Sequence, residues 1–129
     1  MANSNTNRTR SAKQKQVDAA LGHLPPQAVD VEKAVLGSLL IDRDAFTVVS
    51  EILHPETFYD PRHQKIYRAI QTLSLNELPV DMLTVEEELK REGTHDEVGA
   101  PLYLAELTMN VSSSVNILTH ATILADKYI

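Results

Sequence analysis

The sequence contains no cysteine and no tryptophan, and its four glycines are scattered along 129 residues. Without cysteine the chain can form neither a disulfide nor a thiolate zinc site, which is consistent with a cytoplasmic protein. No apolar run approaches the roughly 18 residues that span a bilayer, so we expect no membrane anchor. The first residues, MANSNTNRTRSAKQKQ, lack the apolar segment of a secretion signal. The length suits one domain with a real core, but not two.

Motifs typical of enzymes are also missing. The chain has no GxxxxGKS or GxxxxGKT phosphate-binding loop and no GxSxG nucleophile motif. Its histidines never fall at HExxH or HxxxH spacing, so a zinc site would require distant residues to converge. We therefore expect no catalytic, cofactor-binding or metal-binding residues in this chain.

Acidic residues outnumber basic ones by 18 to 12, and the excess is unevenly placed. Residues 1–18 hold Arg8, Arg10, Lys13 and Lys15 against Asp18, whereas the remainder holds eight basic and 17 acidic residues, a net charge of −9. Phosphate affinity comes from lysine and arginine, so this acidic part is a poor candidate for gripping nucleic acid. The basic segment could touch DNA, but its composition favours a solvated leader.

The apolar pattern predicts an all-α domain of about six helices, with residues 1–23 as a disordered leader and residues 24–129 folded. The first expected helix covers residues 27–41. Its second half, AVLGSLLI, is apolar enough to be buried on most sides. Gly37 should let a neighbouring helix approach closely, although a helix also tolerates a glycine without such a reason.

Two further helices have recognisable ends. Asp42 or Asp44 should cap a helix that stops before His54 and Pro55, with a short turn over residues 56–59. Asp81 should cap a helix that ends at Gly93, a favourable residue for the left-handed conformation beyond a helix.

Charged residues near this last helix invite a metal-site interpretation. Glu86, Glu87 and Glu88 are consecutive, so they point in different directions on a helix and indicate a solvated face instead. His95 and Asp96 follow Gly93 and are expected to lie in an exposed loop.

The segment FYDPRHQKIYRAI, residues 58–70, combines an acid, an imidazole and a phenol. Asp60 can cap the orphan amides of a helix, and Pro61 suits the first helical position. Ile66 and Ile70 then fall on one apolar face. Asp60 and His63 are also the one tempting acid–imidazole pair, but no nucleophile or pocket accompanies them. The structural interpretation is therefore preferred.

The final segment carries a wide apolar stripe at helical spacing and has no glycine, proline or polar turn to end it. We expect the helix to continue beyond the chain, as in a truncated protein. Its stripe exceeds what a terminal helix needs, so part of it should meet a partner while the rest packs on its own bundle. The expected contacts are Ile117, Leu118, Ala121, Leu124, Ala125 and Tyr128.

Four segments in order resemble the N-terminal domain of the DnaB family of replicative DNA helicases. They are LPPQAVDVEKAVLGSLLID (24–42), FYDPRHQKIYRAI (58–70), PVDMLTVEEELKREG (79–93) and GAPLYLAEL (99–107). No single segment is diagnostic, but their order and short spacers are specific. The resemblance covers residues 24–129 and leaves the leader outside.

The resemblance implies a small orthogonal helical bundle whose last helix is the first arm of a helical hairpin. In the parent hexamer such domains form a collar through paired hairpins, and the collar docks the primase and a helicase loader. It implies that ATP and magnesium are used by a separate RecA-like domain, which also acts on DNA. This chain would then be an oligomerisation and interaction module without catalysis of its own.

Two alternatives remain open. The helicase-binding C-terminal domain of a primase has a similar fold, but a leader at the N-terminus and the LPPQ and GAPLYLAEL segments argue against it. A small stand-alone enzyme using Asp60 and His63 is the other alternative.

Overall fold

The structure, a computed structural model, describes residues 26–109, 111 and 116–128, and these residues form helices and no strand. The predicted leader, residues 1–23, lies outside this described part. The described residues form seven α-helices: α2 (Pro26–Ile41), α3 (Ala45–Val49), α4 (Pro61–Leu75), α5 (Met82–Glu92), α6 (His95–Val98), α7 (Leu102–Met109) and α8 (Ile117–Tyr128). A 3₁₀ turn, η1 (Pro55–Thr57), precedes α4. The all-α prediction is confirmed.

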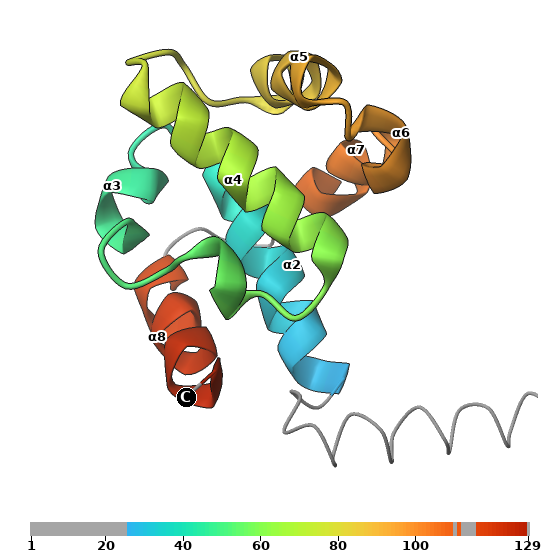
Figure 1. The fold of residues 1–129 in the computed structure, drawn as a ribbon. Helices are drawn as coiled ribbons and strands as arrows, with labels where there is room; N and C mark the ends of the chain where they lie inside the picture. The colour runs from blue at the N-terminus through green and yellow to red at the C-terminus, as the bar shows by residue number, and fades with distance from the viewer. Residues whose placement is uncertain (1–25, 110, 112–115, 129) are drawn as a thin grey trace, which may run out of the picture.

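Helix α2 lies at the centre, with α4 crossing it and α8 beside it, while α5 lies across the far end of α4 (Figure 1). Its second half is buried as the apolar run predicts, with Val35 and Leu36 fully buried. Gly37 is the point of closest approach to α7. A Cβ there would collide with the carbonyl oxygen of Leu107 and with the Val111 side chain. The close approach expected at Gly37 is therefore present.

Helix α4 begins at the predicted Asp60 cap. The Asp60 carboxylate accepts the Arg62 backbone N–H at 2.8 Å, and Pro61 takes the first helical position. Ile66 and Ile70 are fully buried, and Tyr67 between them donates its hydroxyl to the Leu53 carbonyl at 3.0 Å. One face of α4 thus forms the middle of the core.

Two local predictions need correction, and a third differs only in its bounds. The helix after Asp42 ends at Val49, several residues before His54, in a run of β-branched residues that lowers helix propensity. The turn expected over residues 56–59 is present, but it starts one residue earlier, as the 3₁₀ turn η1. The expected loop after Gly93 contains helix α6, which the sequence analysis missed because four residues are too few to establish a period.

Candidate functional site

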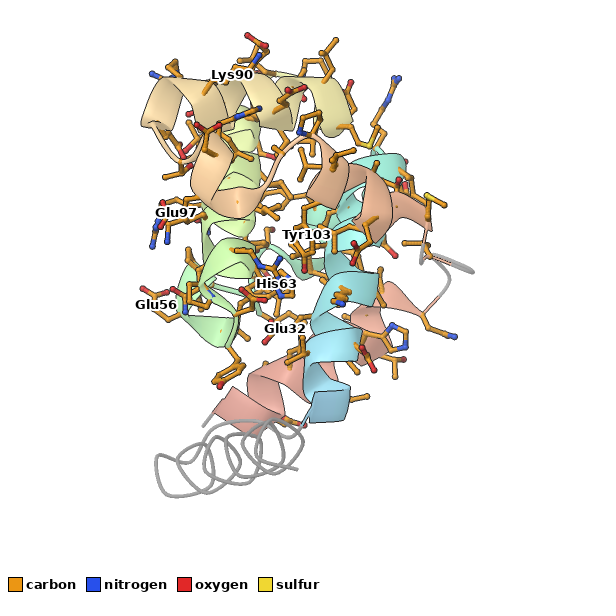
Figure 2. The ribbon with its side chains drawn as sticks, turned by 90° about the vertical axis from the view of Figure 1, so that its right-hand side faces the viewer. Glu32, Glu56, His63, Lys90, Glu97 and Tyr103 are labelled. Carbon is orange, nitrogen blue, oxygen red and sulfur yellow. The ribbon has the colours of Figure 1, made fainter. Side chains whose placement is uncertain are left out.

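Three polar side chains from separate helices meet inside the domain (Figure 2). Glu32 comes from α2, His63 from the first turn of α4 and Tyr103 from α7. Glu32 and His63 are both 0% exposed. His63 Nδ1 lies 2.6 Å from Glu32 Oε1, and His63 Nε2 lies 2.6 Å from the Tyr103 hydroxyl. We refer to these residues as the Glu32–His63–Tyr103 cluster.

Glu32 also holds the backbone that leads into α4. Its carboxylate accepts the Tyr59 N–H at 2.5 Å and the Asp60 N–H at 3.4 Å. With Nδ1 protonated, His63 donates to Glu32, and its Nε2 accepts the Tyr103 hydroxyl hydrogen. Every polar atom of the cluster then has a partner, as a buried polar group requires.

Asp60 and Arg62 cover the cluster from the solvent side. Arg62 Nη2 lies 2.9 Å from Asp60 Oδ2, and the Arg62 guanidinium lies 3.9 Å from the centre of the Tyr103 ring. Burial alone would raise the pKa of Asp60, but the hydrogen bonds from Arg62 outweigh it and hold that pKa below its usual value. Burial also raises the pKa of Tyr103 to about 12, so its phenol stays protonated at neutral pH.

The cluster is not arranged for acid–base catalysis. Asp60 Oδ2 lies 3.9 Å from His63 Nε2, within reach of an ion pair but too far for a hydrogen bond, so the acid–imidazole pair that the enzyme alternative requires has no hydrogen bond between its members. Both ring nitrogens of His63 face other protein atoms, and its side chain has no exposed surface. A substrate cannot reach the imidazole, and the stand-alone enzyme alternative therefore loses its candidate base.

The predicted solvent exposure of the α5 glutamates is only partly confirmed. Glu87 is exposed as expected, but Glu88 is buried, and Arg91 holds its carboxylate through two bonds of 3.1 and 2.6 Å. The prediction of a solvated face is wrong for Glu88, because a bidentate arginine compensates its burial.

His95 is likewise not in an exposed loop. Its Nε2 lies 3.0 Å from Glu86 and its Nδ1 lies 3.0 Å from Asp96. Hydrogen bonds to Glu86, and then to Asp96, raise the pKa of His95. Within the described ranges no group of three or more potential ligands could hold a metal ion.

Some residues of the apolar stripe of α8 are buried in the domain core, and others are exposed. Ile117, Ala121 and Leu124 are buried in the core of the same chain, because α8 packs against α2 and α3. Leu118 is 53% exposed, and Ile123 is also exposed. Ala125 is half-buried, and the side chain of Tyr128 lies outside the described part. A partner could therefore reach Leu118 and Ile123 but not the three buried residues, and partner contact by this helix stays a prediction.

Sequence reasoning missed two members of the buried cluster, Glu32 and Tyr103. Glu32 offered one signal, since it is a lone acid on the inward side of a helix that is otherwise apolar toward its end. Tyr103 offered none, because an aromatic in a short apolar helix is ordinarily core. Separately, no helix among the described residues is long and apolar enough to cross a membrane.

Comparison with known proteins gives concordant results. A family model described as the DnaB-like helicase N terminal domain matches residues 24–126. The replicative DNA helicase DnaB of Rhodothermus marinus is 51% identical over 106 residues, which are 82% of this chain and 11% of that protein. The replicative DNA helicase DnaC of Bacillus subtilis (strain 168) is 41% identical over 82% of this chain and 23% of its own length.

A solved structure agrees with these relatives. The crystal structure of the N-terminal domain of DnaB helicase from Mycobacterium tuberculosis superposes with a TM-score of 0.77 and 39% sequence identity. The match covers 81% of this chain and 76% of that chain. The chain thus spans a small part of the two whole relatives, but it matches most of the solved N-terminal domain from Mycobacterium tuberculosis.

Proposed function

The chain belongs to the family of DnaB-like helicase N-terminal domains, and from this premise we propose that it acts as the collar module of a hexameric replicative helicase. In this role it joins neighbouring copies into the ring and docks the primase. The observation that carries the proposal is the family match over residues 24–126 together with the 39% identical solved domain. The same matches disfavour the primase-domain alternative.

Helix α8 supplies the physical support for self-association. Ile117, Ala121 and Leu124 fix one side of α8 to the bundle, while Leu118 and Ile123 expose apolar side chains on the two flanks of that side. Apolar helix surface that its own chain does not cover is typical of a helix that packs against a partner. We place the contact between copies on this uncovered surface of α8, which we call its outer face.

The work on DNA is assigned to the rest of the helicase. The net charge of the chain is −6, which does not favour a phosphate backbone. The chain also has no phosphate-binding loop, so we assign ATP and magnesium to a RecA-like domain of the whole protein. DNA is then contacted through the assembled ring, a helicase loader is a further partner of the collar, and the site of action is the cytoplasm.

Isothermal titration with the helicase-binding domain of the cognate primase tests the docking role. The titration uses this chain and, in parallel, a chain extended through both arms of the helical hairpin. We expect saturable heat with the extended chain at least. If neither chain binds, primase docking belongs to another part of the helicase.

Sedimentation velocity over a range of concentrations tests the role of α8. Leu118→Glu puts a charge on the outer face and should weaken self-association of the extended chain by about tenfold or more. Leu75→Glu is the control, because Leu75 is also exposed, at 83%, but lies at the end of α4. Equal weakening by both variants, or none by Leu118→Glu, would move the contact away from α8.

A further inference from the structure

A second apolar surface lies where the end of α2, the start of α5 and the end of α7 meet. It encloses a hollow of about 410 Å³ lined by Leu40, Ile41, Asp81, Met82, Leu83 and Thr108. Ile41 and Leu83 are 54% and 68% exposed, and Met82 is also partly exposed. Met109, which follows Thr108 and ends α7, is largely exposed as well. We call this the α2–α5–α7 hollow.

The lining suits apolar side chains of a protein and not a charged small molecule. Asp81 is the single ionisable residue that lines the hollow in the described part of the chain, and its carboxylate already accepts the Thr84 N–H at 2.9 Å as the cap of α5. Methionine is flexible and polarisable, so Met82 can adapt to differently shaped partners. Met82 is 38% exposed and lines the hollow, so its side chain is accessible to a partner.

Leu83 borders a neighbouring hollow as well. This second hollow has a volume of about 690 Å³ and includes Leu73 and Leu78 from the end of α4 and the following loop. Lys90 and Arg91 line that second hollow, but they are paired with Glu87 and Glu88. Apolar surface of this kind accepts the apolar face of an amphipathic helix.

The charge of the residues around the α2–α5–α7 hollow determines which partner helices it favours. Asp81 lines the α2–α5–α7 hollow, and Asp42 directly follows Ile41 at the end of α2. Among the described residues no lysine or arginine lines this hollow, and the nearby Arg43 lines a different one with Phe46 and Leu78. Carboxylates at a rim favour a partner with positive flanks and repel one with negative flanks.

We propose that the α2–α5–α7 hollow docks an amphipathic helix of a partner protein, with aliphatic residues in the hollow and basic residues against Asp42 and Asp81. The aliphatic residues pack between Ile41, Met82 and Leu83. The basic residues at either end of the helix set its direction and its discrimination against acidic helices. This inference extends the proposed docking role, on which it rests, by naming a surface and the chemistry of its partner.

Two synthetic helical peptides test the proposal with this chain. Both carry leucines at i, i+3, i+4 and i+7, and their flanks are lysine in one and glutamate in the other. In a titration followed by backbone amide NMR, the lysine peptide should shift residues around Ile41, Leu83 and Thr108. Its affinity should exceed that of the glutamate peptide by about tenfold and should fall as salt is added.

Variants at exposed positions complete the test. Leu83→Glu should weaken binding of the lysine peptide by about tenfold, since it puts a charge in the apolar hollow. Leu102→Glu is the matched control, because Leu102 is also exposed but does not line the hollow. Shifts that map to α8, equal affinity for both peptides, or equal binding by Leu83→Glu and wild type would each overturn the proposal.

The experiments distinguish a failure of the α2–α5–α7 hollow proposal from a failure of the proposed collar role. If the primase domain binds wild type and Leu83→Glu equally, the docking role stands and the α2–α5–α7 hollow is not its surface. If the lysine peptide binds the hollow and the primase domain does not bind at all, the hollow stands and the primase role fails.

Discussion

A buried carboxylate loses its hydration, and hydrogen-bond donors must replace the lost water. At Glu32 these donors are His63 Nδ1 at 2.6 Å and the backbone N–H groups of Tyr59 and Asp60. One side chain of α2 thereby holds the chain just before α4, and His63 passes the connection on to Tyr103 in α7. The cluster ties together three segments that are distant in sequence.

Removing the charge of Glu32 should therefore be costly. We expect Glu32→Gln to lower the free energy of unfolding by about 3 kcal/mol, because it breaks a buried pair and leaves His63 Nδ1 with a weaker partner. Tyr103→Phe removes only one hydroxyl and should cost about 1 kcal/mol. Urea denaturation of both variants measures the difference. Equal costs would mean that the carboxylate has no special part in the cluster.

Gly37 is a second residue whose replacement has a defined consequence. Gly37→Ala adds a methyl group that collides with the Leu107 carbonyl oxygen and the Val111 side chain. Overpacking outweighs the better helix propensity of alanine, so we expect a net loss of about 1–2 kcal/mol in the free energy of unfolding. Glu87→Ala on the exposed face of α5 serves as control and should change stability little. An unchanged Gly37→Ala variant would show that α7 can move away from α2.

The structural role of a single residue could be predicted from sequence where that role depends on the residue's own size or on its neighbours in the chain. Gly37 stood out because a glycine inside an apolar helix suggests close approach, and the crossing with α7 bears this out. Glu32 and Glu88 did not stand out, because their burial depends on His63 and Arg91. Of these two partners, His63 lies on a different helix. Periodicity alone cannot report such a pairing.

At the scale of the helix, ends are set by short-range hydrogen bonds. Asp81 and Thr84 form a reciprocal capping box at the start of α5, with both bonds at 2.9 Å. Gly93 ends α5 in the left-handed conformation with a φ of 80°. The end of α4 has the same hydrogen-bond pattern, but Glu77 occupies the left-handed position with a φ of 57°. A side chain is strained there, whereas glycine is not.

Exchanging residue types at these two ends should give opposite effects. Glu77→Gly relieves the left-handed strain and should raise the free energy of unfolding by about 0.5 kcal/mol. Gly93→Ala introduces the same strain and should lower it by about 1 kcal/mol. Thermal and urea unfolding of both variants give the two signs. A loss of stability in Glu77→Gly would mean that the glutamate side chain makes a stabilising contact that outweighs its strain.

Helices with strong end signals were predictable, and short ones were not. Asp60 with Pro61, and Asp81 with Gly93, marked α4 and α5 because capping depends on neighbours in sequence. Helix α6 has four residues, less than two turns, so no apolar period could reveal it. Its position is set instead by packing against α4 and α5.

At the scale of the whole molecule, one glutamate links stability to pH near neutrality. Partial desolvation raises the pKa of Glu92 to about 7, and the neighbouring Glu88 carboxylate adds to the effect. The opposite shift occurs at Glu88, where the hydrogen bonds from Arg91 hold the pKa below its usual value. Glu92 therefore retains a proton in the folded chain at a pH where the unfolded chain has released it.

Stability should consequently fall as the pH rises through this range. The contribution of Glu92 is fully present below pH 4.5, its ordinary pKa, and is lost as the pH rises through about 7. Glu92→Gln mimics the protonated form of the side chain. This variant should therefore lose less stability than wild type as the pH rises. Glu87→Gln, on the exposed side of the same helix, is the control and should keep the wild-type slope. Urea midpoints measured from pH 5 to pH 8 decide between these outcomes.

Surfaces formed by several helices are the least accessible to sequence reasoning. The apolar stripe of α8 could be predicted because Ile117, Ala121 and Leu124 recur on one helix with a regular period, although the structure buries these residues in the chain's own core. The α2–α5–α7 hollow could not, since Ile41, Leu83 and Thr108 come from three helices that only the tertiary packing brings together. The pattern of each helix alone gives no sign of it.

The central place of α2 has a consequence for how the domain opens. Helix α2 contacts α3, α4, α7 and α8, so its amides cannot reach water unless several helices separate together. Hydrogen exchange at Leu36 and Leu39 should then follow the global unfolding equilibrium, whereas the short helix α6 should exchange through local fraying. The slowest-exchanging protons of the chain would lie in α2, and their protection would provide an internal gauge of stability in any variant or complex.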